Sequence, residues 1–194
     1  TVHVKYGEAM AILAGDALQA GAFESIAADE LLSSTSRTQL IHALAVASGR
    51  KGMVAGQVLD MHHETVKASE QQLIAMHRGK TGALIEFSMI SAGIIAQVDD
   101  HTRERLRRFG EIIGLAFQVR DDILDEIGDS ATLGKQAGAD RHRQKSTFVS
   151  ILGLSSAQSR LEQLTTEAIS TIEALGSSAQ GLKLLGHYVA GREY

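Results

Sequence analysis

The sequence contains no cysteine, no proline and no tryptophan, and aromatic residues make up only 4% of its 194 residues. Without cysteine the protein has neither disulfides nor thiolate metal ligands, which is compatible with the reducing cytoplasm, so we expect a cytoplasmic protein. Without proline the strongest helix breaker is missing, and long helices are permitted. A core with few aromatic residues is built from aliphatic side chains, which favours packing of helix on helix.

The chain also lacks an excess of positive charge and a long hydrophobic run. Its formal net charge is -4, which argues against binding to nucleic acid or to an anionic membrane surface. No apolar run approaches the roughly 20 residues that a membrane helix needs. The first five residues lack a secretory hydrophobic segment. We therefore expect no nucleic-acid partner and no membrane span.

Apolar residues recur at helical rather than strand spacing, which predicts an all-α fold in a single domain over residues 1–194. The first expected helix, over residues 8–26, is apolar on all sides and should be buried or lie in a subunit contact. Caps are expected among Ser34, Thr35 and Ser36, at Ser69 and at Thr102. Gly49, Gly52 and Gly56 suggest tight packing or a kink within the second helix, and three glycines predict a loop over residues 128–138. The further helices are expected over residues 38–62, 69–96, 102–127, 145–154, 156–175 and 180–190.

Three aspartates near the end of the fourth expected helix form the strongest chemical signal. Asp121, Asp122 and Asp125 are three and four residues apart, so their carboxylates lie on one helical face. Carboxylates this close repel one another unless a cation compensates them, and hard oxygen ligands suit Mg²⁺. Gln118 precedes them by one turn on the same face. The alternative is an acidic helix end that is simply solvated.

Lysines beside small residues form the second signal. Gly134-Lys135 lies in the expected glycine loop, Lys145-Ser146-Thr147 follows it, and Lys80-Thr81 lies in the middle of the expected third helix. A glycine loop that carries lysines can close over an anion held by a metal. Solvated surface lysines are the simpler interpretation for each motif taken alone.

Taken in order, these motifs resemble the trans-isoprenyl diphosphate synthases, and the closest likeness is to the bacterial farnesyl (geranyl-transferring) diphosphate synthase group. The resemblance extends over almost the whole chain, and it is the combination rather than any single motif that is specific. The opening His3-Val4-Lys5-Tyr6-Gly7-Glu8 is similar to the segment that follows the first aspartate motif of that family. The other matching residues are Gly56-Gln57-x-x-Asp60, Lys80-Thr81-Gly82, Phe117-Gln118-x-x-Asp121-Asp122-x-x-Asp125, Gly134-Lys135 and Lys145-Ser146-Thr147.

The resemblance implies a fold and a reaction. The fold would be the all-α isoprenoid-synthase bundle, in a homodimer, and the reaction would join isopentenyl diphosphate to an allylic diphosphate such as dimethylallyl or geranyl diphosphate. The product would be a short-chain isoprenyl diphosphate such as farnesyl diphosphate. Metals and lysines around the leaving diphosphate would stabilise its charge as the allylic cation forms.

The resemblance also implies roles for individual residues. Mg²⁺ would be the cofactor, with Asp121, Asp122 and Asp125 as its ligands. Catalytic roles would fall to Lys80, Thr81 and Gln118. The substrates would be bound by Lys80, Phe117, Gln118, Lys135 and Lys145.

The family's first aspartate motif, the arginine pair after it and the N-terminal helices have no counterpart in this sequence. We therefore expect the chain to be the C-terminal portion of a longer protein and to be inactive on its own. Smaller departures, Gln144 before Lys145 and Val149 where the family commonly has proline, bear on the geometry of the expected loop.

Two other functions remain open. A terpene cyclase shares the fold, but its second metal motif usually mixes Asn, Ser or Thr with Glu, whereas this chain has three aspartates. A non-catalytic subunit or scaffold would explain the missing first motif, but it would not need the lysines and aspartates that remain. Asp60, His62, His63 and Glu64 could suggest a separate metal cluster, although a polar helix end is the simpler interpretation.

Overall fold

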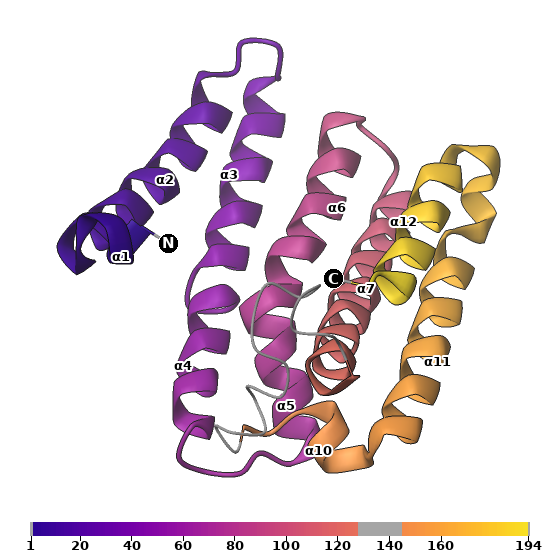
Figure 1. Ribbon diagram of the computed structural model, residues 1–194. Helices are drawn as coiled ribbons and strands as arrows, with labels where there is room; N and C mark the ends of the chain where they lie inside the picture. The colour runs from indigo at the N-terminus through magenta and orange to yellow at the C-terminus, as the bar shows by residue number, and fades with distance from the viewer. Residues whose placement is uncertain (1, 128–144, 194) are drawn as a thin grey trace. The chain divides into compact units, whose positions relative to one another are not determined.

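The structure is a computed structural model that describes residues 2–127 and 145–193 (Figure 1). Every regular element within these ranges is helical, so the all-α fold predicted from the sequence is confirmed. The chain divides into two compact units, Thr1–Ala45 and Val46–Tyr194. The single domain expected from the sequence stays a prediction. Among the described helices, none combines the length and the apolar character needed to cross a bilayer.

The first unit contains α1 (Val2–Tyr6), α2 (Glu8–Ala28) and most of α3 (Ser34–Ser48). The helix expected over residues 8–26 forms, but none of its residues is buried, and Leu18 is 76% exposed. Its expected burial is therefore wrong within this chain, because its apolar residues surround the axis and no single stripe faces a partner. The cap before α3 is Ser33, whose Oγ accepts from the Ser36 backbone N–H at 3.0 Å, and not one of the three residues after it.

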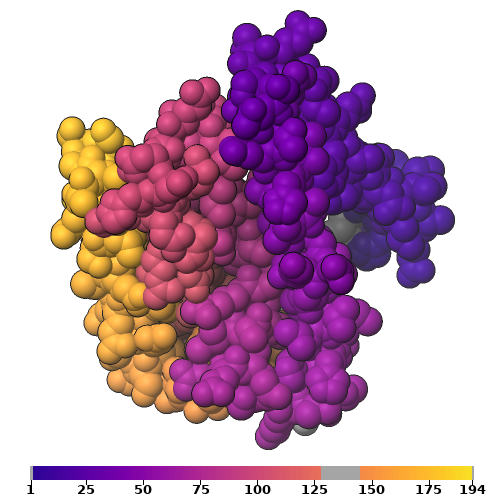
Figure 2. Space-filling model, turned by 180° about the vertical axis from the view of Figure 1, so that it is seen from behind, coloured from indigo at the N-terminus to yellow at the C-terminus, as the bar shows by residue number. Residues whose placement is uncertain are grey.

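The second unit is organised around α7 (Asp100–Ile127), the longest helix of the described residues. Helices α6 (Ala83–Ile95) and α11 (Leu154–Ile172) pack along it, and α12 (Gln180–Gly191) packs on both α7 and α11. Seen from behind, the orange α11 and the yellow α12 lie side by side along one edge of this unit (Figure 2). Its other elements are α4 (Met53–His63), α5 (Glu70–His77), η1 (Arg78–Gly82), α10 (Phe148–Leu152) and η2 (Glu173–Ala179).

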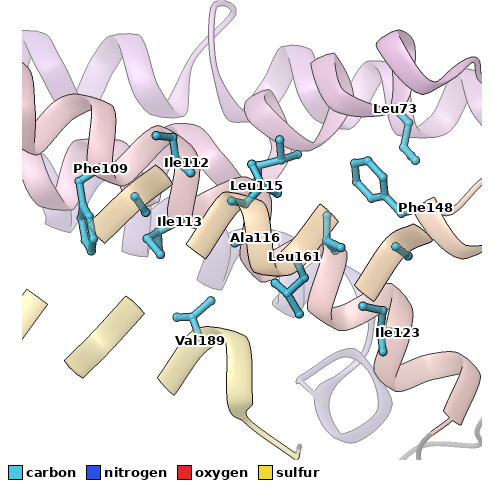
Figure 3. Packing of buried hydrophobic residues seen from close by; sticks show 14 of the residues in the cluster. Leu73, Phe109, Ile112, Ile113, Leu115, Ala116, Ile123, Phe148, Leu161 and Val189 are labelled. Atoms are coloured by element: carbon cyan, nitrogen blue, oxygen red, sulfur yellow. The ribbon is translucent and has the colours of Figure 1, made fainter. Parts of the chain in front are cut away.

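The core of the second unit is aliphatic with two buried phenylalanines, as the composition predicts. Toward both ends of α7 the buried residues recur every three or four positions, which is the spacing of one helical face, whereas the run Ile112–Ala116 in its middle is buried on every side. Leu73 of α5 lies against the ring of Phe148, and Val189 of α12 lies on the other side of α7 (Figure 3). The α7 residues in this core are Phe109, Ile112, Ile113, Leu115, Ala116, Val119 and Ile123.

Several expected boundaries shift for identifiable reasons. The helix expected over residues 38–62 is split into α3 and α4, because the chain turns at Gly52, where a Cβ would lie 2.0 Å from the Ala47 carbonyl oxygen. The cap at Ser69 is confirmed, since its Oγ accepts from the Gln72 backbone N–H. The cap of α7 is instead Asp99, which accepts from the Thr102 backbone N–H at 2.7 Å.

Candidate functional site

A single turn of π-helix, η1, lies at the centre of the site and carries Lys80 and Thr81. Glycines hold this turn between two helices. A Cβ on Gly56 of α4 would lie 1.9 Å from the Lys80 backbone nitrogen, and a Cβ on Gly114 of α7 would lie 2.8 Å from the Gly82 Cα. Only hydrogen fits at these positions, so the two helices fix the backbone of η1 from both sides. Isolated π-turns are frequent at functional sites, and no local pattern of residues predicts this one.

Two lysines from distant parts of the chain meet at one buried carboxylate. Lys80 Nζ donates to Asp60 Oδ2 at 2.5 Å, and Lys145 Nζ lies 3.1 Å from Asp60 Oδ1. The Asp60 side chain is 8% exposed, whereas the side chains of both lysines are about a third exposed. The carboxylate is therefore enclosed, and the lysines reach from it toward solvent.

The same lysines shift the pKa values of their neighbours. Burial alone would raise the pKa of Asp60, but the hydrogen bonds and charges of Lys80 and Lys145 outweigh it and hold that pKa below its ordinary value. Burial and the nearby Lys145 charge lower the pKa of His77 to about 4. His77 is therefore neutral at pH 7, and its ring stacks on Phe148 with 5.7 Å between ring centres.

Local hydrogen bonds fix the segment that follows Lys145. The Ala68 backbone N–H donates to Ser146 Oγ at 3.0 Å, which joins this segment to the one before α5. Thr147 and Ser150 form a capping box at the start of α10. The Phe148 backbone N–H donates to Asp122 Oδ2 at 2.7 Å, which joins the segment to α7.

Asp122 and Asp125 lie beside Lys145 in a cavity of about 140 Å³. Both aspartates are buried, and they come from the last two turns of α7. The rest of the lining comes from the start of α10 and from Glu126. The cavity therefore brings together two of the predicted metal ligands and one of the predicted diphosphate ligands. Its lining residues are Asp122, Asp125, Glu126, Lys145, Thr147, Val149 and Ser150.

The third aspartate has a different environment. Asp121 is 39% exposed and forms an ion pair with Arg192, and it accepts from Gln118 Nε2 at 3.1 Å. Arg192 also lies over the ring of Phe117, 4.0 Å from its centre. The Arg120 guanidinium donates to the Arg192 carbonyl oxygen and holds this segment against α7.

The carboxylates fit a metal that is shared with a phosphate ligand. Within the described ranges, no three His, Asp or Glu side chains form a group that could hold a metal by themselves. Mg²⁺ does not need such a group, because it retains waters and takes its remaining ligands from one or two carboxylates and from phosphate oxygens. Asp122 and Asp125 beside Lys145 offer that combination of hard oxygen donors and an anion-binding cation.

The other predicted residues have varied positions. Thr81 is half-buried in η1, and Lys135 lies outside the described residues. His63 Nδ1 lies 3.2 Å from the Val66 carbonyl oxygen, while His62 is exposed, which agrees with a polar helix end.

Two arginines near the start of α7, Arg107 and Arg108, form several ion pairs. Arg107 is paired with Glu86 of α6 as well as with Glu104 and Glu111 of its own helix. Arg108 is paired with Glu111 and with Glu167 of α11. These ion pairs link α7 to both of its long neighbours.

Two residues of the site, Asp60 and Arg192, were not predicted to contact the aspartates or lysines there. Asp60 matched a family motif but carried no sign of its contacts with lysines 20 and 85 positions later. Arg192 carried no motif at all, and its ion pair with Asp121 joins residues 71 positions apart. Both contacts are made by tertiary packing, which local sequence patterns do not encode.

The relatives found by different comparisons with known proteins agree with one another. A sequence model described as polyprenyl synthetase matches residues 1–179. The chain is 44% identical over 180 residues to a farnesyl diphosphate synthase of Haemophilus influenzae, covering 90% of this chain and 60% of that protein. It is 42% identical over 199 residues to the farnesyl diphosphate synthase of Escherichia coli, covering 99% of this chain and 66% of that protein.

Solved structures give the same result. The chain is similar to an FPP/GFPP synthase from Zymomonas mobilis, with a TM-score of 0.85 and 36% identity, over 97% of this chain and 64% of that one. It is also similar to a Helicobacter pylori geranyltransferase complexed with magnesium and isoprenyl diphosphate, with a TM-score of 0.84 and 35% identity, over 97% of this chain and 62% of that one. The chain thus spans about 60–66% of the length of these relatives.

Proposed function

The chain belongs to the polyprenyl synthetase family, and from this membership we propose that the protein is a Mg²⁺-dependent prenyltransferase. It joins an allylic diphosphate, dimethylallyl or geranyl, to isopentenyl diphosphate and releases inorganic diphosphate. The product is a short-chain isoprenyl diphosphate such as farnesyl diphosphate. The relatives named farnesyl diphosphate synthase support this choice of substrates.

One observation carries the proposal. Lys80 and Lys145 meet at Asp60, and Lys145 also lines the cavity that contains Asp122 and Asp125. Lysines provide positive charge for a diphosphate, and carboxylates provide oxygen ligands for the cation that accompanies it. A scaffold without chemistry would have no need to keep both kinds of group in contact.

The reaction breaks the allylic C–O bond, and the departing diphosphate takes the electron pair. Lys80 and Lys145 donate hydrogen bonds to the diphosphate oxygens, which stabilises the negative charge as it develops. When bound to Asp121, Asp122 and Asp125, Mg²⁺ would supply further charge neutralisation at those oxygens. The alkene of isopentenyl diphosphate then forms the new C–C bond, and loss of a proton from that substrate restores neutrality.

Other residues of this chain act on the carbon skeleton. Thr81 and Gln118 present neutral oxygen dipoles to the allylic cation, so they stabilise it without a nucleophilic charge that would capture it. Phe117 lies next to Gln118 and provides an aromatic surface near isopentenyl diphosphate. Lys135 would add a third positive charge to the diphosphate.

We also propose that the protein is a cytoplasmic homodimer. The exposed apolar side chains of α2, among them Met10, Leu13 and Leu18, would be covered by the second copy. Burial of this helix in a subunit contact would explain why its apolar residues are not confined to one stripe.

Labelled isopentenyl diphosphate, supplied to the longer protein of which this chain is expected to be the C-terminal portion, tests the proposal directly. With Mg²⁺ and dimethylallyl or geranyl diphosphate, we expect the label to enter an acid-labile isoprenyl diphosphate, and EDTA should abolish its incorporation. Asp125→Ala should lower the turnover number by about 100-fold or more, the size of effect that follows loss of one electrostatic contact in a transition state.

The two alternatives predict different products. A cyclic hydrocarbon formed from the allylic diphosphate alone would indicate a terpene cyclase. Binding of diphosphate by that longer protein without any turnover would indicate a non-catalytic subunit. Either result would overturn the proposed reaction.

A further inference from the structure

Asp60 has no part in the chemistry proposed above, yet it contacts both of the described lysines at the site. Each of its two carboxylate oxygens faces a different lysine, at 2.5 Å for Lys80 and 3.1 Å for Lys145. Oδ2 accepts a charge-assisted hydrogen bond from Lys80, and Oδ1 forms an ion pair with Lys145. Asp60 is therefore a bridge between two cations that are 65 residues apart in the sequence.

This arrangement is unexpected if the site serves only to attract an anion. A negative charge beside two lysines weakens their attraction for a diphosphate, so net charge alone would favour a neutral residue at this position. The neighbouring lysines also hold the pKa of Asp60 below its ordinary value, so its negative charge persists at neutral pH. Its presence requires a benefit that outweighs the electrostatic cost.

The benefit is that Asp60 holds the ammonium groups of the two lysines in place. Two ammonium groups on flexible side chains repel each other and separate unless an anion holds them. The backbone that carries Asp60 is held in place, because Gly56, one turn earlier on α4, contacts the backbone of η1 directly. Lys145 is equally constrained, because Ser146 and Phe148 are hydrogen-bonded to neighbouring elements.

Each lysine retains protons for a ligand. An ammonium group has three donors, and the contact with Asp60 occupies one of them. The side chains of Lys80 and Lys145 are 32% and 33% exposed, so their outer surfaces are accessible while Asp60 is enclosed behind them. The remaining donors of both lysines can therefore reach the same ligand.

We propose that Asp60 is a positioning residue, which holds the ammonium groups of Lys80 and Lys145 together so that both donate to one diphosphate group. The inference rests on the proposed function, because it assigns a diphosphate to these lysines. It predicts that a carboxylate strengthens the binding of an anion.

Calorimetric titration of the 194-residue chain with inorganic pyrophosphate and Mg²⁺ provides the test. We expect Asp60→Asn to weaken pyrophosphate binding by about tenfold, although the variant carries one negative charge less. Asp60→Glu keeps the charge and moves the carboxylate by one methylene, and we expect binding to weaken by about threefold. The Glu variant separates position from charge, since the net charge of the protein does not change.

A matched control removes a negative charge nearby without touching the lysines. Glu64 is exposed directly after α4, and Glu64→Gln should leave the affinity for pyrophosphate within about twofold of the wild type. Circular dichroism confirms that each variant is folded. If Asp60→Asn does not fold, the Asp60→Glu titration decides the question.

A spectroscopic measurement separates positioning from a purely structural role. Hydrogen-bonded lysine ammonium groups exchange their protons slowly enough to be observed by ¹⁵N NMR at low temperature. We expect signals from Lys80 and Lys145, assigned with Lys80→Arg and Lys145→Arg, and we expect both to disappear in folded Asp60 variants. A carboxylate that only stabilised the fold would leave them unchanged.

The outcomes distinguish the two proposals. If the wild-type chain does not bind pyrophosphate with Mg²⁺, the proposed function of this site fails and the inference fails with it. If the wild type binds but the two Asp60 variants bind equally well or more tightly, the inference alone is overturned. Unchanged lysine signals in those variants would overturn it as well.

Discussion

Helices α2 and α7 show how little mean composition says about burial. Helix α2 consists almost entirely of small and apolar residues, and none of its 21 residues is buried. Helix α7 carries many charged residues, and 13 of its 28 residues are buried. The difference lies in their arrangement, because the apolar residues of α7 form one face and those of α2 surround the axis.

The comparison teaches that an apolar stripe specifies a partner within the chain, whereas uniform apolarity does not. The apolar residues of α7 pack against α5, α6, α10, α11 and α12, while its charged residues pair with α6 and α11. Helix α2 has apolar side chains in every direction and offers no preferred face to the rest of its unit. Such a helix is best suited to burial within a larger assembly.

Truncation of a large side chain should affect stability very differently in the two helices. Phe109 of α7 is fully buried, so Phe109→Ala should lower the free energy of unfolding by about 3–5 kcal/mol through lost contacts and a cavity. Leu18→Ala in α2 should change the value for a single, undimerised copy by less than about 0.5 kcal/mol, because Leu18 is 76% exposed within the chain. Urea denaturation of the two variants measures both values. A large loss in Leu18→Ala would show that α2 is buried in solution.

The second prediction concerns a buried polar group, His77, and the pH dependence of stability that it causes. The pKa of His77, which packs against Phe148, is lowered from 6.5 to about 4, so the unfolded chain takes up a proton first as the pH falls. The stability contributed by neutral His77 is present above pH 6.5 and is lost between pH 6.5 and 4, by about 3 kcal/mol in total. Urea denaturation across that range should show the loss.

The variant His77→Phe provides the control for this pH dependence. It keeps an aromatic ring beside Phe148 and removes the titrating group. We expect its stability to fall less steeply between pH 6.5 and 4 than that of the wild type. Equal slopes in the two proteins would contradict the lowered pKa.

The third and smallest effect compares two helical glycines. A Cβ on Gly56 would lie 1.9 Å from the Lys80 backbone nitrogen, so Gly56→Ala should destabilise the protein by about 1–3 kcal/mol. Gly15 of α2 has nothing within 4 Å of the same position, and Gly15→Ala should stabilise the protein by about 0.5–1 kcal/mol. Thermal unfolding shows whether the two changes have opposite signs, and equal signs would contradict this reading of the glycine contacts.

The general architecture was predictable because helical periodicity is a local property. The spacing of apolar residues located most of the helices, and the capping box at Ser69 confirmed one of the expected starts. The cap of α7 was misplaced because Asp99 and Thr102 are both good caps, and only the structure shows which side chain accepts the hydrogen bond. The burial of α2 was mispredicted because hydrophobicity alone does not identify a partner.

Only those parts of the candidate site whose residues lie close together in the sequence could be predicted. The aspartates of α7 could be recognised because they are three and four residues apart, and Lys80 because it lies among small residues in a helix. Their partners could not be recognised in the same way. Asp60 and Arg192 reach the site through packing across 20 to 85 residues of sequence, and no local spacing encodes such contacts.

The π-turn η1 requires a fixed number of residues between α5 and α6. Each residue of an α-helix rotates the chain by about 100°, and a π-turn accommodates one residue more than an α-turn. Deleting any one residue from 78–82 would restore an α-helical turn, in which Lys80, Thr81 and Gly82 cannot all keep their present positions between Gly56 and Gly114. Insertions and deletions should therefore be tolerated far less well here than substitutions of exposed side chains.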